Sequence, residues 1–432
     1  MGDKKRIGVG LLGLGVVGSG VARAILEKEG TIAEELGYSL KLKRILVRDT
    51  SKPRSVKIDN SLLTLEAREI FDDPEIDIVV EVMGGESPAL DYIKQALSNQ
   101  KYVVTANKEV IAKYGSDLLE IAQEKGVDIL YEASVGGGIP LILPLQQGLL
   151  ANRITALYAI INGTTNYILS RMSHEKVSFS LALKKAQELG YAEADSGNDI
   201  EGIDAAYKLA ILATSAFHTK IHPKDIYCEG IARLSEYDFH YAKELGYEIK
   251  LLAIAKEIDG AIEVRVHPAF IPQDFLLAKV SGVYNAIQIE GDLVGKVLFY
   301  GEGAGASPTS SAILADLLAA LRHIGSGSKS LPRLSFSRPK AVKPISQIKT
   351  RYYLRMSVAD QPGVLAQIAK TLGEYSISIS SVIQKEADDQ NQTAEIVIMT
   401  HPAMEQAMQQ ALRDMKEFPV VKEICNFIRV EG

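Results

Sequence analysis

A glycine pattern close to the start of the chain limits the fold more than any other feature. Residues 5–12 read KRIGVGLL, a buried-strand pattern, and glycines follow at 13, 15 and 18 before a helical segment. In such a G-x-G-x-x-G turn, Gly13 permits a tight bend, Gly15 lets the backbone approach a pyrophosphate, and Gly18 lets helix pack on strand. The phosphates then lie at the N-terminus of the helix. The context predicts a dinucleotide-binding unit, and a merely tight strand-to-helix turn is the alternative.

The segment that follows alternates strands with helices. Strand patterns occur at LKLKRILVRD, DIVVEVMGG, KYVVTANK and VDILYEASV, with helical segments between them. Such alternation is typical of a parallel, doubly wound sheet. We therefore predict an α/β class fold with a Rossmann-type, NAD(P)-binding domain over residues 1–132, to which a later helix at 305–325 returns.

The rest of the chain has two further patterns. Residues 133–304 contain long helices and strands that alternate apolar and polar residues, which predicts an α+β domain whose sheet has one covered face. Residues 326–349 are rich in Ser, Pro and Lys, so we expect a linker there. Residues 350–432 follow the order βαββαβ, which predicts a ferredoxin-like domain.

Composition restricts the partners and the compartment. The chain has 432 residues and a net charge of -6, so we expect no nucleic acid and no anionic membrane as partner. No apolar run reaches the length of a transmembrane helix. Cys228 and Cys425 are too few for a disulfide framework, which favours a reducing, cytoplasmic location.

The end of the second predicted strand indicates which dinucleotide binds. The segment VRDTSKPR places Arg48, Lys52 and Arg54 around Asp49. An acid at this point grips a ribose hydroxyl, whereas basic residues accommodate a 2′-phosphate. Three cations beside one acid favour NADP. NAD stays the alternative, because an insertion lengthens the spacing from the glycines.

The segment YAEADSGNDIEGIDAAYKLAILA, residues 191–213, crowds five acids together. It can be read as a metal site, as the acidic start of a helix, or as a pocket for a charged substrate. A divalent metal would want histidines or a tighter ligand pattern. The helix after Asp204 is apolar on nearly every face, which indicates burial, and Lys208 on it is then partly withdrawn from water and suited to proton transfer. Three of the acids are assigned to an ammonium group, namely Glu193, Asp199 and Asp204.

Two other segments offer chemistry, each with a plainer alternative. Lys108 follows a strand at TANK, where ligands gather in open α/β sheets, although a solvated lysine is the alternative. In EASVGGGIP, Glu132 precedes three glycines with exposed carbonyls, and a carboxylate plus several carbonyls suits a hard cation, although a flexible corner between domains is the alternative. No cysteine occurs before Cys228, which argues against a thioester route and favours direct hydride transfer.

These motifs together resemble the homoserine dehydrogenase family, of the monofunctional kind with a C-terminal ACT domain. The matching segments run in the family's order from GLGVVGSG through EVMGG, TANK, EASVGGGIP, INGTTNYIL, ELGYAEAD, DIEGIDAAYKLAILA and GEGAGASPTSSAILADL to DQPGVLAQIA. The resemblance implies reversible, NAD(P)-dependent interconversion of L-homoserine and L-aspartate 4-semialdehyde, on the pathway to threonine and methionine.

The resemblance also implies roles for individual residues. Lys208 matches the proton-donating lysine, and Lys108 matches a lysine near nicotinamide and substrate. The substrate site comprises Glu193, Asp199, Asp204 and Thr164. The cofactor site comprises Gly13, Gly15, Val16, Val17, Gly18, Arg48, Gly84, Thr105, Lys108, Gly190 and Gly305. A monovalent cation, sodium in most of the family, is implied at Glu132, Val135, Gly137 and Ile139.

The last domain carries a regulatory expectation. Its DQPG segment, residues 360–363, resembles the amino-acid-binding loop of ACT domains, and threonine is the first effector to test. A domain used only for assembly is the alternative. The resemblance also implies that residues 133–304 form the catalytic and dimerisation domain, and we expect a homodimer or a homotetramer.

Two rival functions stay open from the sequence. One is a different amino-acid or hydroxy-acid dehydrogenase built from the same two halves. The other is a non-catalytic regulator that senses a nucleotide and an amino acid. The presence of both lysines and all three acids argues against the second.

Overall fold

The computed structural model describes residues 5–326, 339–385 and 392–432. The chain forms two compact units. The first comprises Met1–Ile154, Tyr207–Pro223 and Glu290–Pro339, and the second comprises Thr155–Ala206, Lys224–Ile289 and Lys340–Gly432. The predicted boundary at residue 132 stays a prediction. Most of the predicted linker, residues 327–338, lies outside the described residues.

The first unit is built on a six-stranded sheet in the order β3-β2-β1-β4-β5-β6, with every neighbouring pair parallel. The strands are β1 Lys5–Leu12, β2 Tyr38–Leu46, β3 Leu63–Thr64, β4 Ile78–Glu81, β5 Tyr102–Thr105 and β6 Ile129–Leu130. This parallel, doubly wound sheet is the one that the strand and helix alternation predicts.

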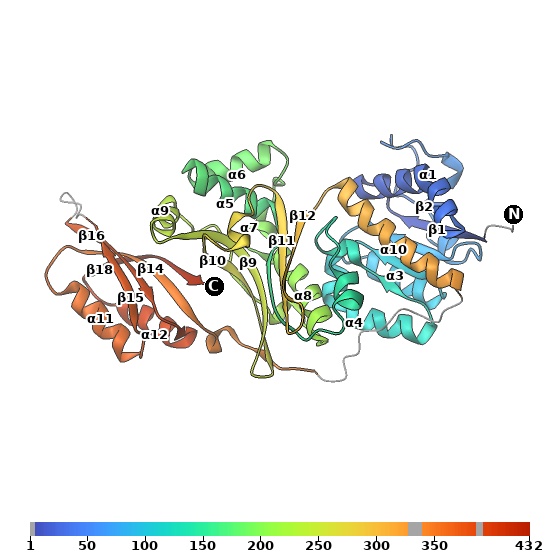
Figure 1. The fold of residues 1–432 in the computed structure, drawn as a ribbon. Coiled ribbons are helices and arrows are strands. Elements are labelled where there is room, and N and C mark those ends of the chain that lie inside the picture. The colour runs from blue at the N-terminus through green and yellow to red at the C-terminus, as the bar shows by residue number, and fades with distance from the viewer. Residues whose placement is uncertain (1–4, 327–338, 386–391) are drawn as a thin grey trace. The chain divides into compact units, whose positions relative to one another are not determined.

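Helices cover the sheet of the first unit (Figure 1). They are α1 Val16–Leu36, α2 Arg68–Phe71, α3 Ala89–Ser98, α4 Lys108–Lys125 and α10 Ala306–Ser326. The late helix α10 packs against α1, and both share one buried cluster with alternate residues of β1. The unit also contains short helical turns and a strand, namely η1 Asn60–Leu62, η2 Glu132–Ser134, η3 Pro144–Gly148 and β12 Gly295–Glu302.

The second unit contains a mixed sheet with the order β11-β7-β9-β10-β18-β14-β16-β15. Its longer strands are β7 Ile154–Ile160, β9 Tyr247–Ile258, β10 Ala261–Pro272, β11 Tyr284–Gly291, β14 Lys349–Ala359, β15 Ile379–Gln384, β16 Thr393–Thr400 and β18 Val421–Val430. The two-residue strands are β8 Tyr227–Cys228, β13 Val342–Lys343 and β17 Ala403–Met404. The sheet is therefore the α+β component that the alternating pattern predicts.

The helices of this unit fall in the middle and at the end of the chain. They are α5 Gly163–Glu175, α6 Phe179–Glu188, α7 Gly197–Ile200, α9 Glu236–Glu244, α11 Val364–Glu374 and α12 Glu405–Lys416, with turns η4 Pro223–Asp225, η5 Leu276–Lys279 and η6 Ile345–Gln347. Helix α8, Ile203–Phe217, starts in the second unit and continues into the first, because the division falls after Ala206.

The C-terminal region has the predicted ferredoxin-like order, β14-α11-β15-β16-α12-β18. Its own core consists of apolar residues from these strands and from both helices. The region is nevertheless joined to the middle of the chain by main-chain pairing, since β18 runs parallel to β10 with Ala269 opposite Arg429 and Phe270 opposite Val430. Two shorter strands, β13 and β8, pair with earlier residues of β10 in the same direction.

Buried charges cross this junction. Arg265 of β10 is 2% exposed and donates to Glu431 at 2.6 Å and to Glu263 at 3.0 Å. Arg429 of β18 donates through two nitrogens to Glu405, at 2.9 and 2.6 Å, and through a third to Glu229 at 2.7 Å. Such paired arginines are strong, geometrically specific contacts, so the junction is fixed by charge as well as by the sheet.

Across the described ranges, no helix is long and apolar enough to span a membrane.

Candidate active site

The glycine-rich turn has the conformation that its sequence predicts. Gly13 follows β1 with a φ of 101°, which favours glycine. A Cβ on Gly18 would lie 2.2 Å from the carbonyl oxygen of Gly13, so a side chain there would push α1 away from β1. A Cβ on Gly15 would have no heavy atom within 4 Å. Its backbone therefore faces open space at the N-terminus of α1, where a phosphate can approach.

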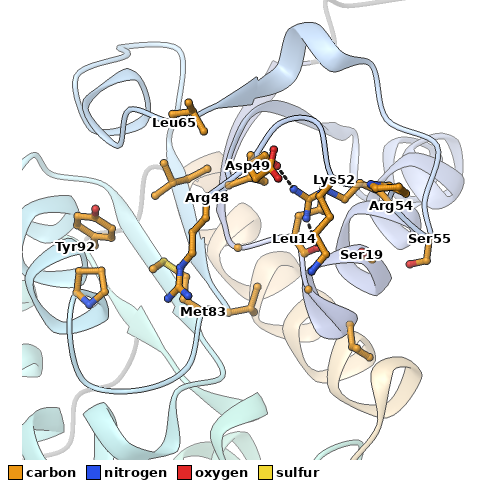
Figure 2. Close-up of a pocket in the computed structure, with 18 residues that line it drawn as sticks. Leu14, Ser19, Arg48, Asp49, Lys52, Arg54, Ser55, Leu65, Met83 and Tyr92 are labelled. Carbon is orange, nitrogen blue, oxygen red and sulfur yellow. Dashed lines mark hydrogen bonds between the residues drawn. The ribbon is translucent and has the colours of Figure 1, made fainter.

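A cavity of about 800 Å³ opens beside this turn (Figure 2). Its volume is in the range of cofactor sites. Four of the predicted cofactor residues line it, namely Gly13, Gly15, Val16 and Arg48. Val16 is 75% exposed, which leaves it accessible to a ligand.

The loop after β2 forms the polar wall of the cavity. The carboxylate of Asp49 accepts hydrogen bonds from the N–H and the hydroxyl of Ser51, at 2.8 and 2.7 Å, and these bonds lower the pKa of Asp49. Arg54 donates to the carbonyls of Leu14, at 3.3 Å, and Asp49. Arg54 thus fastens the loop to the glycine turn. Figure 2 shows Arg48 beside Met83, and Lys52 also lines the cavity.

Polar residues at the ends of β4 and β5 hold the next loops in place. Thr105 donates to the buried carboxylate of Glu81 at 2.6 Å, and the N–H of Met83 donates to the same carboxylate at 2.7 Å. Burial raises the pKa of Glu81, against these hydrogen bonds. Asn107 caps α4 through the N–H of Val110, and its amide donates to the carbonyl of Gly85 at 2.7 Å. The hydroxyl of Thr105 therefore joins the end of β5 to the end of β4.

The other predicted cofactor residues lie outside the lining of the cavity. Val17 and Gly18 belong to α1, and Gly84 has a φ of 73° in the loop after β4. Gly305 has a φ of 119° directly before α10. Gly190 belongs to the second unit. Their contacts with a cofactor stay predictions.

The predicted cation loop is tightly organised. The carboxylate of Glu132 accepts from the N–H groups of Leu141, Ile142 and Leu143, at 2.5, 2.8 and 2.8 Å. Both carboxylate oxygens therefore accept hydrogen bonds at the start of the next helical turn. Gly137 has a φ of 55° and packs so closely that a Cβ would lie 2.5 Å from the carbonyl carbon of Gly303. The loop can offer a cation main-chain carbonyls, as a hard ion prefers.

A second buried acid adjoins this loop. Asp316 of α10 accepts from the N–H of Glu132 at 2.9 Å. Burial raises the pKa of Asp316 well above its ordinary value, and the negative charge of Glu132 adds to the effect. No ion pair to either acid occurs among the residues the structure describes. A bound cation would stabilise the ionised form of Asp316 beside Glu132, so the local chemistry fits the predicted site.

In the second unit, the acidic segment forms the short helix α7 and the first turn of α8. Asp199 belongs to α7 and is half-buried, whereas Asp204 lies in the first turn of α8 and is buried. Gly202 connects the helices with a φ of 80°. A Cβ on Gly202 would lie 3.0 Å from the sulfur of Cys228. The turn that brings the two acids together therefore needs glycine.

One asparagine joins these acids. Asn162 follows β7, and its amide nitrogen donates to Asp199 at 2.7 Å and to Asp204 at 2.8 Å. Its amide oxygen accepts from the N–H of Thr165 at 2.8 Å and so caps α5. The two acids thus converge on a single buried side chain.

The remaining substrate residues lie on nearby segments of the same unit. Thr164 donates to the carbonyl of Tyr191 at 2.6 Å, which links α5 to the loop that carries Gly190 and Glu193. Glu193 is exposed. Its carbonyl accepts from Gln187 at 3.3 Å.

Both predicted catalytic lysines are half-buried and assigned to the first unit. Lys108 is the first residue of α4, directly after the cap Asn107. Lys208 lies on α8, four residues after Asp204, and therefore on the same face of that helix. The partial burial expected for Lys208 is confirmed.

A parallel sheet with a dinucleotide turn, together with converging acids and a lysine one helical turn away, defines the class of pyridine-nucleotide-dependent oxidoreductases. Three family models match: the homoserine dehydrogenase NAD binding domain at residues 13–132, homoserine dehydrogenase at 140–318, and the ACT domain at 352–420. The chain belongs to the homoserine dehydrogenase family, as the sequence motifs predict.

Individual relatives support this assignment over the full length. The homoserine dehydrogenase of Synechocystis is 44% identical, and the match covers 98% of this chain and 99% of that protein. The crystal structure of a homoserine dehydrogenase from Thiobacillus denitrificans is 43% identical, covers 99% of both chains and has a TM-score of 0.92. A hyperthermophilic archaeal homoserine dehydrogenase is 28% identical with a TM-score of 0.62, and covers 73% of this chain.

The sequence did not single out two residues that the structure places at the site. Asn162 contacts acids that lie 37 and 42 residues later in the chain, and Asp316 contacts a residue 184 positions earlier. Asparagine before a helix is an ordinary cap. Nothing in the sequence around Asn162 indicates that its side chain also contacts two acids.

Proposed function

We propose that this homoserine dehydrogenase interconverts L-homoserine and L-aspartate 4-semialdehyde with NADP, and that Lys208 transfers the proton. The observation that carries the proposal is the convergence of Asp199 and Asp204 on one asparagine, at the start of the helix that also carries Lys208. Carboxylates suit a substrate ammonium group, and a lysine one turn away suits its reacting oxygen.

Each residue then has a separate task. Glu193, Asp199 and Asp204 bind the substrate's amino group and hydroxyl, and Thr164 orients it. Bound NADPH supplies a hydride to the aldehyde carbon. Lys208 donates a proton to the carbonyl oxygen, while the charge of Lys108 stabilises the developing alkoxide. The reverse reaction uses the same groups in the opposite sense.

NADP is favoured over NAD by the polar wall of the cavity. Arg48 and Lys52 line it, and the carboxylate of Asp49 is engaged by Ser51. A carboxylate that already accepts two hydrogen bonds is a poor partner for a ribose 2′-hydroxyl, whereas two cations suit a 2′-phosphate. The archaeal relative was solved in complex with NADPH.

A monovalent cation, sodium in our proposal, is held at Glu132 and by the main-chain carbonyls of Val135, Gly137 and Ile139. Three N–H groups fix the Glu132 carboxylate in the loop, and its second oxygen, which accepts only one of these bonds, keeps a lone pair for the cation. A cation bound here would favour the ionised form of the buried acid Asp316, whose pKa is otherwise raised by burial and by the charge of Glu132.

Regulation and assembly follow from the C-terminal domain. We infer that threonine binds at the DQPG loop, where Gly363 has a φ of 94° before α11, and that the enzyme acts as a homodimer or homotetramer. Both cysteines are free, as suits a reducing, cytoplasmic location.

The direct test is oxidation of L-homoserine with NADP or NAD, with and without sodium and threonine, followed by absorbance of the reduced cofactor. We expect turnover that is faster with NADP, is stimulated by sodium and is lowered by threonine. Turnover of another hydroxy amino acid in place of homoserine would contradict the substrate assignment.

The proton donor is tested by Lys208→Ala. Loss of a general acid lowers kcat by roughly 10²–10⁴-fold. Lys220→Ala is the control, since Lys220 pairs with the exposed acids Asp117 and Glu120, and we expect its kcat to equal wild type. A Lys208→Ala variant with wild-type kcat would remove this assignment.

The cofactor preference is tested by Lys52→Ala and Arg48→Ala. Each variant removes a cation from the cavity wall, so KM for NADP should rise roughly 10-fold, the equivalent of about 1.4 kcal/mol, while KM for NAD changes little. Lys57→Ala removes an exposed lysine outside the cavity lining and serves as control. Equal effects on both cofactors would contradict a 2′-phosphate site.

A further inference from the structure

The side chain of Asn162 uses its whole hydrogen-bonding capacity at one point. The residue is 5% exposed and lies between β7 and α5, as the N-cap of α5. Its oxygen faces the N–H and the hydroxyl of Thr165, at 2.8 and 3.0 Å. Because a main-chain N–H requires an acceptor, the oxygen must lie on this side and the amide nitrogen must face the acids.

The amide nitrogen has two hydrogens, and each has its own acid. One bond reaches Oδ1 of Asp199 at 2.7 Å, and the other reaches Oδ2 of Asp204 at 2.8 Å. Two carboxylates near one point repel each other, and a donor between them offsets that repulsion. The asparagine therefore holds the two acids at a fixed separation, although they belong to different helices.

This arrangement also places Lys208. Asp204 is in the first turn of α8 and Lys208 is in the next turn, so a contact that anchors Asp204 anchors the start of the helix that carries the lysine. Asn162 itself is anchored through its cap on α5 and through β7. Through Asn162, the position of the two acids is therefore tied to β7 and α5 of the second unit.

We propose that Asn162 is a positioning residue, which sets the spacing of Asp199 and Asp204 for a substrate that carries an ammonium group. This inference rests on the proposed function, because it assumes that these acids bind the substrate. Asn162 acts through the acids and needs no contact with the substrate.

The test separates the capping role from the bridging role. Asn162→Ser keeps a cap for α5 but cannot reach the acids. Asn162→Asp keeps the shape and the cap but presents a carboxylate to two carboxylates. Loss of charge-assisted hydrogen bonds should raise KM for homoserine roughly 10–100-fold in Asn162→Ser and more in Asn162→Asp. KM for NADP should stay at the wild-type value in both.

Asn166→Ser is the matched control. Asn166 is 1% exposed on the same helix, and its amide donates to the carbonyl of Tyr284 at 3.0 Å. We expect a lower melting temperature with wild-type KM for homoserine. If Asn162→Ser shows that same pattern, or if KM for both substrates rises together, the positioning role is wrong and the residue is only a cap.

A parallel measurement on Asp199→Asn keeps this inference distinct from the proposed function. If Asp199→Asn leaves KM for homoserine unchanged, the assignment of the acids fails whatever Asn162 does. If Asp199→Asn raises KM and Asn162→Ser does not, the acids bind substrate and the inference alone fails. If Asn162→Ser does not fold, the test is made with Asn162→Asp, by comparing its KM for homoserine and its KM for NADP with those of wild type.

Discussion

At the scale of single residues, the buried acids of the first unit are the least ordinary feature. Glu132 is 4% exposed and Asp316 is 7% exposed, and the second accepts from the N–H of the first. Buried carboxylates are costly unless a cation or hydrogen bonds compensate them. Three N–H groups compensate Glu132, whereas Asp316 has a raised pKa. Asp316 therefore works against folding when it is ionised.

Asp316→Asn should stabilise the first unit at neutral pH. The pKa of Asp316 is raised in the folded state, so the folded chain binds the extra proton, and stability falls as pH rises from the unfolded pKa through the folded one. The asparagine side chain cannot ionise, so the variant should not lose stability in this way. A gain of about 1 kcal/mol in the free energy of unfolding would raise the melting temperature by roughly 2–4 °C. Thermal unfolding from pH 4 to pH 8, in a buffer whose only cation is a bulky organic ion, measures it.

The control is Asp91→Asn, which removes an exposed acid in the first turn of α3. Its melting temperature should follow the wild-type pH dependence. A difference between Asp316→Asn and wild type that stayed constant across the pH range would show that ionisation of Asp316 is not the cause.

The conformation of the glycine-rich turn could be predicted from sequence, because it depends on local residues. Gly13, Gly15 and Gly18 follow from their spacing alone, because backbone conformation and close packing select glycine. Asn162 and Asp316 could not be predicted in the same way. Each contacts residues that are distant in the chain, and the sequence around each reads as an ordinary helical cap or an ordinary helical acid.

At the scale of elements, one short segment connects the acids with the C-terminal domain. The N–H of Ile231 donates to the carbonyl of Ile200, and Cys228 donates to the carbonyl of Glu201 at 3.1 Å. Between them, Glu229 accepts from Arg429 of β18. Segment 227–231 therefore supports the connection between α7 and α8 on one side and binds the last strand on the other.

Gly230→Ala should disturb the acids without unfolding the unit. A Cβ there would lie 2.5 Å from the carbonyl oxygen of Ile200 and 2.8 Å from the Cα of Glu201. These distances are shorter than van der Waals contact, and both neighbours are main-chain atoms. The segment that connects Asp199 with Asp204 must therefore move. We expect KM for homoserine to rise several-fold, by analogy with the loss of a charge-assisted contact, while KM for NADP is unchanged.

Gly373→Ala is the comparison for this variant. It adds a methyl group to α11 where no heavy atom lies within 4 Å, and alanine in a helix is favoured over glycine by roughly 0.5–1 kcal/mol. It should raise the melting temperature and leave both KM values alone. A Gly230→Ala enzyme with wild-type KM for homoserine would mean that the connection tolerates the displacement.

At the scale of the whole molecule, the C-terminal domain is part of a larger sheet. The sequence predicts it as a separate βαββαβ domain after a linker, and the element order is right. The pairing of β18 with β10 could not be predicted, because it joins residues 269–270 to 429–430 and two-residue parallel pairing has no periodic signal. The buried pairs at the junction are equally non-local.

Glu431→Gln should weaken this junction strongly. Burial alone would raise the pKa of Glu431, but the charges of Arg265 and Lys256 outweigh burial and hold it at about 2. Removing one partner of a buried pair costs about 3–5 kcal/mol, which lowers the melting temperature by roughly 10 °C. Since the folded pKa is depressed, the wild-type contribution is present above the unfolded pKa and is lost as pH falls towards 2. Calorimetry between pH 3 and pH 7 measures both effects.

Glu423→Gln on the same strand is the control, because Glu423 is exposed, and its unfolding should match wild type at every pH. If Glu431→Gln lost stability equally at pH 3 and pH 7, the charge of Glu431 would not be the source.

The place of β18 also dictates an order of events during synthesis. The edge of β10 opposite β9 is shared by β8, β13 and β18, which come from segments around residues 227, 342 and 429. As the ribosome extends the chain, β8 is ready before β10, but the last part of that edge stays open until β18 emerges. An unpaired edge invites pairing with other nascent chains. Ribosome-bound intermediates stalled before residue 421 should therefore depend on chaperones more than the released protein does.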